Sequence, residues 1–193
     1  MIQIDFRFIN HSIRLFTSNN HFFEHLKKYS LVLHKIVTLK MYKKEELKFL
    51  NTQFWDEFKT FMTKHKSNSG KRINWLNYKT NIDSIYLRLE TDKNSVRVCF
   101  DIQHKDAEIR SIIWEQMNEL KKVLTDEMGS GNWNDKAFNT TLPEFCRISW
   151  ELNDVHYLNS DDKEKIFLFF EDKLISFDRF YDTYQDILIH LVN

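Results

Sequence analysis

The spacing of apolar residues changes along the chain, and the first clear pattern covers residues 42–66. Apolar side chains recur there at steps of three and four, which places them on one side of a helix. They are Leu47, Leu50, Phe54, Phe58 and Phe61. The sequence SNSG follows at residues 67–70 and favours a turn. The pattern predicts an amphipathic helix that packs one face on the protein and ends before residue 67.

Two segments, residues 84–90 and 95–103, instead alternate apolar and polar side chains around the sequence TDKN, which is typical of a β-hairpin. A two-residue turn at Asp92 and Lys93 places every apolar residue of one strand opposite an apolar residue of the other. The resulting apolar pairs are Leu89 with Val96, Leu87 with Val98, and Ile85 with Phe100. This register is the one we predict.

Four more segments complete the predicted fold. Residues 73–78 and 145–152 indicate short strands, residues 106–128 indicate a helix, and the chain from residue 160 almost to its end is helical in one or two pieces. Gly, Asn and Asp between residues 129 and 135 indicate a loop. The order α-β-β-β-α-β-α is typical of the α+β class, with a mostly antiparallel four-stranded sheet and packed helices.

Length and composition limit the function. A chain of 193 residues, 42% hydrophobic and 15% aromatic, is long enough for a globular domain with a real core. Its 28 basic and 28 acidic residues cancel, which argues against a dedicated nucleic-acid-binding domain but allows a local basic patch. The sequence has no membrane-spanning run, no signal peptide and no metal-ligand spacing around Cys99 or Cys146. We therefore expect a cytoplasmic protein with reduced, buried cysteines, no metal site and no cofactor.

The first forty residues differ from the rest. They hold six basic residues, two acidic residues and four of the eight histidines, which leaves 22 basic and 26 acidic residues in 41–193. Three interpretations stay open: an amphipathic helix that adds to the fold or binds a partner, a histidine metal site without a known ligand motif, or a translated leader before a start at Met41. We predict an N-terminal extension, residues 1–40, and a single α+β domain, residues 41–193.

A series of short segments in that domain carries a resemblance to a known family. They are FWDEF (54–58), INWLNYKT (73–80), YLRLE (86–90), FDIQHKDAEIR (100–110), WEQMNELKKVL (114–124) and, more weakly, FEDKLISFDRFYD (170–182). In this order and spacing they resemble a bacterial family catalogued as domain of unknown function 4268. The resemblance implies no established activity. Similar domains also occur at the end of larger chains with nuclease-like segments, which associates the family with defence or nucleic-acid contexts.

One catalytic hypothesis follows from the predicted strand order, which is also that of restriction-type nucleases. Those enzymes hold Mg²⁺ between an acid on one strand and an acid-x-lysine pair on the next. Asp101 and Lys105 suggest such a site, but Gln103 stands where the acid of the pair belongs. In the predicted register Asp101 faces Ser84, and Glu90 lies about 20 Å from Asp101, too far to share a metal. A catalytic centre at Asp101, Gln103 and Lys105 is therefore the alternative, not the leading hypothesis.

The residues around the end of the second hairpin strand have a structural interpretation. Asp106 stands where the N-cap of the next helix belongs, and its carboxylate can accept hydrogen bonds from the first helical turn. The predicted register also sets Arg88 opposite Arg97, and this repulsion needs compensation, from Glu90 and Asp101 or from acids of the last helix. Without it the two arginines would form an anion site that His104 and Arg110 extend.

Two binding candidates remain. Trp75, Tyr78 and Lys79 lie close together and could stack a base or hold a partner, although Trp75 falls on the core side of its predicted strand. The last helix has apolar residues at alternating steps of four and three, which predicts either a cover for the sheet or a homodimer interface. No nucleophile triad, phosphate loop or zinc motif is present. We therefore predict a non-catalytic binding or regulatory module with a protein or nucleic-acid ligand, and a divergent nuclease-like enzyme as the alternative.

Overall fold

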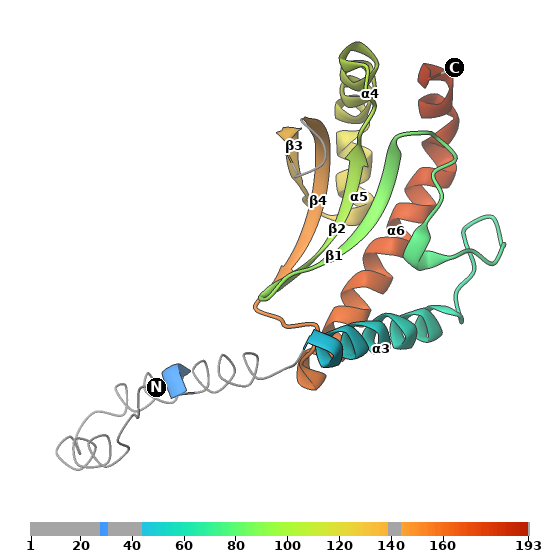
Figure 1. The fold of residues 1–193 in the computed structure, drawn as a ribbon. Coiled ribbons are helices and arrows are strands. Elements are labelled where there is room, and N and C mark those ends of the chain that lie inside the picture. The colour runs from blue at the N-terminus through green and yellow to red at the C-terminus, as the bar shows by residue number, and fades with distance from the viewer. Residues whose placement is uncertain (1–27, 31–43, 139–143, 193) are drawn as a thin grey trace, which may run out of the picture. The chain divides into compact units, whose positions relative to one another are not determined.

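The computed structural model describes residues 28–30, 44–138 and 144–192. The chain divides into two compact units, residues 1–49 and residues 50–193. In the first unit, residues 28–30 are helical and residues 44–49 form the start of helix α3 (Lys44–Met62). The interpretations of residues 1–40 otherwise fall outside the described residues. The second unit contains the sheet and its helices (Figure 1).

Four antiparallel strands form one sheet in the order β1-β2-β4-β3. The strands are β1 (Ile85–Thr91), β2 (Ser95–Ile102), β3 (Asn132–Ala137) and β4 (Phe145–Asn153). The helices are α3 (Lys44–Met62), α4 (Ala107–Glu119), α5 (Lys121–Met128) and α6 (Ser160–Val192). The predicted α+β class and the four-stranded antiparallel sheet are confirmed.

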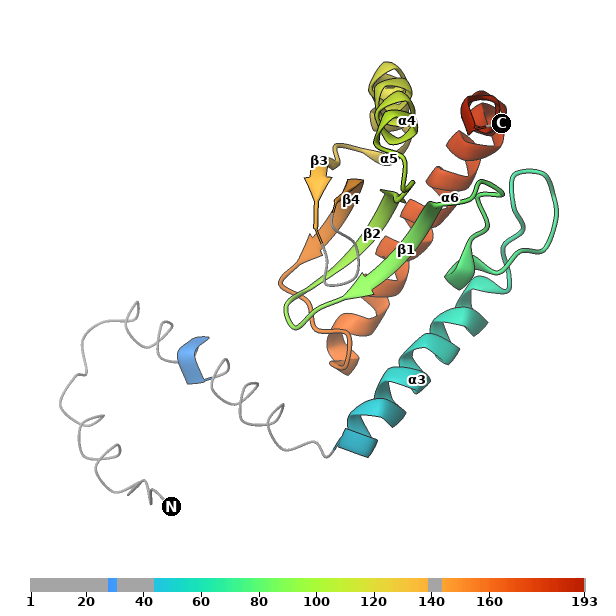
Figure 2. The same ribbon diagram turned by 45° about the horizontal axis from the view of Figure 1, so that its top comes forward.

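One face of the sheet carries the core. Helices α4, α5 and α6 all lie on this side in both ribbon views (Figures 1 and 2). Alternate strand residues point toward them and are buried: Ile85, Leu87, Val96, Val98, Phe100, Ile102, Cys146, Ile148 and Trp150. Helix α3 adds Phe54 and Phe58, whose rings pack on Phe167 of α6. We refer to this side as the covered face.

The long helix α6 covers the sheet with its apolar seam. Phe170, Leu174, Phe177, Tyr181 and Leu188 of the seam are almost completely buried in this chain's own core. The interpretation of this helix as a cover for the sheet is therefore confirmed. Because the chain itself covers these side chains, the seam is not a free surface for a second copy.

Two segments differ from their predicted structure. The strand predicted at residues 73–78 is wrong, because this segment contains a 3-10 helix at Trp75–Asn77. The side chain of Asn74 caps it by accepting hydrogen bonds from the backbone amides of Leu76 and Asn77. The predicted loop at residues 129–135 contains most of the edge strand β3, whose polar sequence NWNDKA has too few apolar residues to show alternation.

The hairpin register is also corrected. Asp92 donates its backbone amide to the carbonyl of Ser95 at 2.8 Å, so the two-residue turn is Lys93-Asn94 and the strands pair two residues away from the predicted register. Side chains alternate with a period of two, so a shift of two residues leaves each one on the same face. The apolar pairs become Leu89 with Val98, Leu87 with Phe100, and Ile85 with Ile102.

The helix predicted at residues 106–128 is divided by Leu120 into α4 and α5. Its predicted N-cap is confirmed, since the Asp106 carboxylate accepts hydrogen bonds from the backbone amides of Glu108 and Ile109. None of the helices in the described part of the chain combines the length and hydropathy that a bilayer span requires.

Candidate functional site on the open face of the sheet

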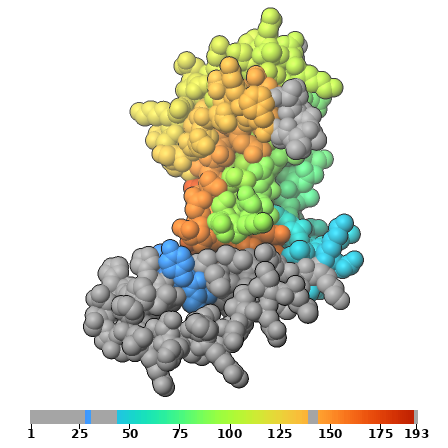
Figure 3. All heavy atoms as spheres, turned by 60° about the vertical axis from the view of Figure 1, so that its left-hand side comes forward, coloured from blue at the N-terminus to red at the C-terminus, as the bar shows by residue number. Residues whose placement is uncertain are grey.

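The other face of the sheet carries no helix in the described part of the chain, and we refer to it as the open face. Figure 3 looks onto this side, where atoms of β1 in green and β4 in orange form part of the surface. Its side chains are those that alternate with the core positions. They include Tyr86, Arg88 and Glu90 of β1, Arg97, Cys99 and Asp101 of β2, and Phe145, Arg147, Ser149 and Glu151 of β4.

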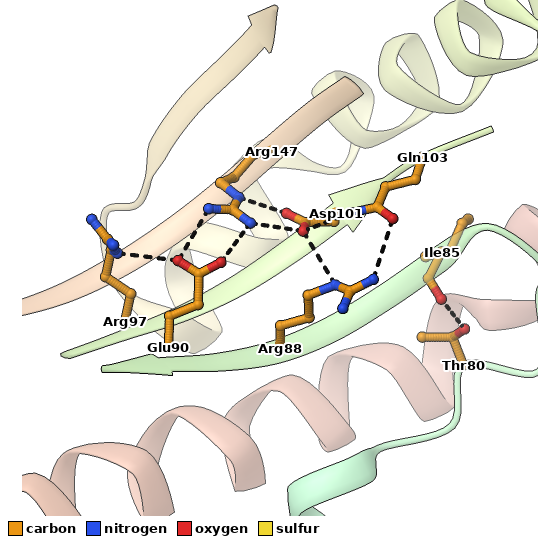
Figure 4. Close-up of polar contacts among 8 residues, drawn as sticks. All are labelled: Thr80, Ile85, Arg88, Glu90, Arg97, Asp101, Gln103 and Arg147. Atoms are coloured by element: carbon orange, nitrogen blue, oxygen red, sulfur yellow. Dashed lines mark hydrogen bonds and ion pairs between the residues drawn. The ribbon is translucent and has the colours of Figure 1, made fainter. Parts of the chain in front are cut away.

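Arg147 is the centre of an ion network on this face (Figure 4). Its Nε donates to Oδ1 of Asp101 at 2.6 Å and its Nη2 donates to Oδ2 at 2.8 Å. The same guanidinium donates to both carboxylate oxygens of Glu90, at 2.7 and 3.2 Å. The hydrogen bonds to Asp101 raise the pKa of Arg147 above its usual range, against the opposing effect of burial. One arginine on β4 therefore joins an acid on β1 to an acid on β2.

Two further arginines extend the network. Nε of Arg88 lies 3.5 Å from Oδ2 of Asp101, and its Nη2 donates to the Gln103 amide oxygen at 3.2 Å. Nε of Arg97 lies 3.4 Å from Oε2 of Glu90, without hydrogen-bond geometry. Arg97 also lies 3.7 Å from Glu151 through its Nη1. Three arginines and three acids thus balance within the network.

The predicted anion site at Arg88 and Arg97 depended on a pairing that does not occur. Arg88 faces Cys99 across the hairpin, and Arg97 faces Glu90. The other alternative, in which Glu90 and Asp101 compensate the two arginines, is what the ion pairs show. Both arginines therefore already hold carboxylate partners.

Asp101 is completely buried although it points away from the core. Arg147, with 21% of its side chain exposed, and Arg88, with 45%, hold its carboxylate, and Gln103 donates to Oδ2 at 3.1 Å. Long arginine stems can cover shorter side chains while their charged ends stay near water. Removing such a carboxylate from water is costly unless it is paired and hydrogen-bonded. The Asp101 carboxylate meets both conditions.

The proposed catalytic residues are placed as follows. Both oxygens of Asp101 accept hydrogen bonds from Arg147, so a metal ion would have to displace the guanidinium. Gln103 belongs to the network, whereas Lys105 is exposed in the turn before α4. The predicted separation of Glu90 and Asp101 is wrong, since both contact Arg147. Within the described residues, no group of three or more His, Cys, Asp and Glu side chains is placed to hold a metal.

The order of strands and helices on which the nuclease hypothesis rested also differs from the prediction. Only β1 and β2 precede α4 within the second unit, because the segment at 73–78 is not a strand. Restriction-type cores place their metal ligands on strands two and three of a three-strand run, and the third strand of that run is not present here. The geometric basis of the catalytic hypothesis is therefore weaker than the sequence pattern implied.

The remaining predicted residues lie outside the network. Arg110 donates to the carbonyl of His104 at 2.9 Å and to Glu144 at 3.2 Å, so it holds the strand-to-helix connection at residues 103–106. Trp75 is buried, and the Tyr78 hydroxyl donates to Asp178 at 2.8 Å. Burial, reinforced by Asp178, raises the pKa of Tyr78. Of that trio only Lys79 is exposed.

A family model for a domain of unknown function (DUF4268) matches residues 50–185. This is well over half of the chain. The chain belongs to this family. The DUF4268 match begins at Leu50, where the second compact unit begins, and it contains every strand of the sheet and the whole ion network. Comparisons with curated proteins and with solved structures found no match.

Sequence patterns did not single out Arg147, the centre of the site. Its signal is an arginine at an open-face position of the strand FCRISWEL, whose alternate residues are apolar. That pattern predicts an outward side chain but not its partners, because nothing local specifies that β4 lies beside β2.

Proposed function

We propose that this domain is a non-catalytic binding module of the bacterial cytoplasm and that it contacts its ligand with the open face. The observation that carries the proposal is the state of Asp101. The catalytic alternative needs this carboxylate free to bind a metal or move a proton, yet it is completely buried and both of its oxygens are held by Arg147. The same network leaves other side chains at the surface.

The ion network holds two side chains, Tyr86 and Arg88, at the surface of the open face. Tyr86 is 41% exposed, and the Arg88 guanidinium lies over its ring, 4.5 Å from the centroid. Tyr and Arg are enriched among residues that dominate binding energy at protein interfaces. Asp101 and Gln103 hold the guanidinium in one orientation, so less side-chain entropy is lost on binding. A pre-organised pair of this kind suits a binding surface.

The charge balance favours a protein ligand over a nucleic acid. Three arginines face three acids in the network, and residues 41–193 carry 22 basic against 26 acidic residues. Affinity for nucleic acid depends on an excess of Lys and Arg near phosphates. We therefore propose that the ligand is a protein.

Site-directed crosslinking tests the surface. A photoreactive phenylalanine analogue replaces Tyr86 in the full chain, and a matched variant carries it at Leu168, which is 51% exposed on α6. In extract of the native cells, we expect a protein crosslink from position 86 and not from position 168, and we expect Arg88→Ala to abolish it. Equal crosslinking from both positions, or a product that survives Arg88→Ala, would show that the open face is not the binding surface.

DNA cleavage tests the alternative. The full chain is incubated with DNA and Mg²⁺ or Mn²⁺ beside Lys105→Ala, an exposed change that leaves the ion network intact. We expect no metal-dependent cleavage from either protein. Cleavage by the wild type that Lys105→Ala abolishes would replace the binding proposal with the nuclease-like one.

A further inference from the structure

The two edges of the sheet differ in how they are protected. Exposed edge strands invite pairing with other chains, and proteins block them with bulges, charges or covering segments. The edge strand β3 has an irregular register between Asn134 and Ala137, with exposed Asp135 and Lys136 in the irregular segment. The edge strand β1 keeps one unbroken register with β2 from Ile85 to Thr91. Of the two edge strands, only β3 is interrupted by an irregular register.

The hydrogen bonds of the hairpin show which groups of β1 face outward. Asp92 and Gln103 donate backbone amides to Ser95 and Ser84, so the even-numbered residues of β1 bond to β2. The odd-numbered residues therefore direct their N–H and C=O groups to the free edge. At Ile85 this edge is capped, because the Thr80 hydroxyl donates to its carbonyl at 2.7 Å (Figure 4).

Beyond Ile85 the edge is open. Leu87, Leu89 and Thr91 have no hydrogen-bond partner for their outward groups among the residues that the structure describes. This open stretch is centred on Leu89. A strand that forms hydrogen bonds with all of these outward backbone groups must lie opposite residues 87–91.

We propose that a second copy of this chain pairs with β1 in antiparallel fashion, about a two-fold axis at Leu89. Leu89 then lies opposite the partner's Leu89, and Leu87 lies opposite the partner's Thr91. Each pair of outward-facing residues makes two hydrogen bonds, and the symmetry repeats the Leu87–Thr91 pair. The two sheets become one continuous sheet across the dimer.

The charges on the open face select the same register. With the axis at Leu89, Arg88 lies opposite the partner's Glu90, and Glu90 lies opposite the partner's Arg88. Outward groups must meet outward groups, so the neighbouring registers place the axis at position 88 or 90. Those registers set arginine against arginine or glutamate against glutamate, and like charges directly opposite repel. The open backbone and the charges therefore agree on one symmetric arrangement.

Both side chains retain capacity for this contact. Arg88 has 45% of its side chain exposed and Glu90 has 29%. The contacts of Arg88 with Asp101 and Gln103 use its Nε and Nη2, which leaves Nη1 for the partner's Glu90. The dimer differs from the one predicted on the α6 seam, which the chain's own core occupies.

Analytical ultracentrifugation of the full chain tests the dimer. We expect a species of twice 23.6 kDa that dissociates on dilution. Arg88→Glu sets two acids opposite each other and Thr91→Pro removes an outward N–H that β2 does not use. Each should raise the dimer dissociation constant by about tenfold or more. Lys105→Glu makes the same charge change away from the edge and should leave the constant unchanged.

Two results would overturn the proposal. One is a wild-type chain that stays monomeric at about 100 μM, a hundredfold above a micromolar dissociation constant. The other is a dimer that neither Arg88→Glu nor Thr91→Pro weakens, with circular dichroism showing that at least one variant is folded. The test is separate from that of the open-face ligand, since a crosslink from position 86 to a second copy has twice the mass of the chain.

Discussion

The covered face and the open face of the sheet both bury side chains, but they do so with different chemistry. On the covered face, apolar strand residues meet the aromatic seam of α6, and Phe100 packs on Phe177 with ring centroids 5.4 Å apart. On the open face, Cys99, Asp101 and Phe145 are as deeply buried, with no helix above them in the described part of the chain. Their cover includes the Arg147 guanidinium, which lies over the Phe145 ring at 5.2 Å from its centroid. Burial therefore does not identify the core.

The two kinds of burial have different energetic consequences. Apolar contact stabilises in proportion to the area removed from water. A buried ion network contributes little net stability, because desolvation offsets the attraction, but the loss of one partner leaves an unpaired charge. The free energy of unfolding should therefore fall when a substitution removes side-chain volume from the covered face. On the open face it should fall when a substitution leaves a charged side chain without its partner.

The largest expected effect is on the covered face. Phe177→Ala removes a fully buried ring at the centre of the α6 seam and should lower the free energy of unfolding by about 4 kcal/mol. Urea unfolding measures the change. Ile187→Ala on the same helix is the control, because Ile187 is exposed and its loss should cost less than about 0.5 kcal/mol. Similar losses at the two positions would mean that the seam is not packed.

A somewhat smaller effect is expected on the open face. Asp101→Ala leaves Arg147 without its main partner in a water-excluded site and should cost about 3 kcal/mol. Arg88→Ala is the matched control, since this arginine is almost half exposed and its loss should cost about 1 kcal/mol or less.

The pair Asp101→Leu with Arg147→Met sharpens the result. Replacing both partners by apolar side chains leaves no unpaired charge between them, so the double variant should be more stable than Asp101→Ala. If Asp101→Ala costs no more than Arg88→Ala, the network is open to water and the two faces do not differ as described.

Local sequence patterns predicted most of the fold. Alternation located β1, β2 and β4, and the Asp106 cap marked the start of α4. Steps of three and four located the buried side of α6 and, through Phe54 and Phe58, that of α3, although Leu47 of the predicted stripe is exposed. The register of the hairpin could not be obtained in this way, because a shift of two residues satisfies alternation equally well. The turn sets the register. In that turn the Asp92 carboxylate accepts a hydrogen bond from the backbone amide of Lys93 at 2.7 Å.

The candidate site was harder to predict from the sequence than the fold. Glu90, Asp101 and Arg147 lie on three strands, and the pairing of β2 with β4 joins residues more than forty positions apart. Local pattern places each side chain on a face but does not bring the strands together. Strand β3 was missed for a related reason, since an irregular, polar edge strand has no alternation to detect.

The smallest expected effect compares one thiol on each face. Burial is the main cause that raises the pKa of Cys99 on the open face to about 12 and that of Cys146 on the covered face to about 11. An unfolded thiol has a pKa of about 8.5. Above that pH the unfolded chain loses thiol protons that the folded chain keeps, so the free energy of unfolding falls as pH rises. Below about pH 7.5, where unfolded thiols keep their protons, the two thiols contribute almost no slope.

Urea unfolding between pH 8 and pH 9 measures this slope, below the pKa of about 10 at which unfolded tyrosines ionise. Each thiol should contribute up to about 1.4 kcal/mol per pH unit, so Cys99→Ala and Cys146→Ala should each remove a similar part of the decline. If only Cys146→Ala flattens the slope, Cys99 ionises in the folded chain, and the arginines of the open face do not exclude water. Equal flattening would mean that three paired arginines protect a thiol as well as a layer of helices does.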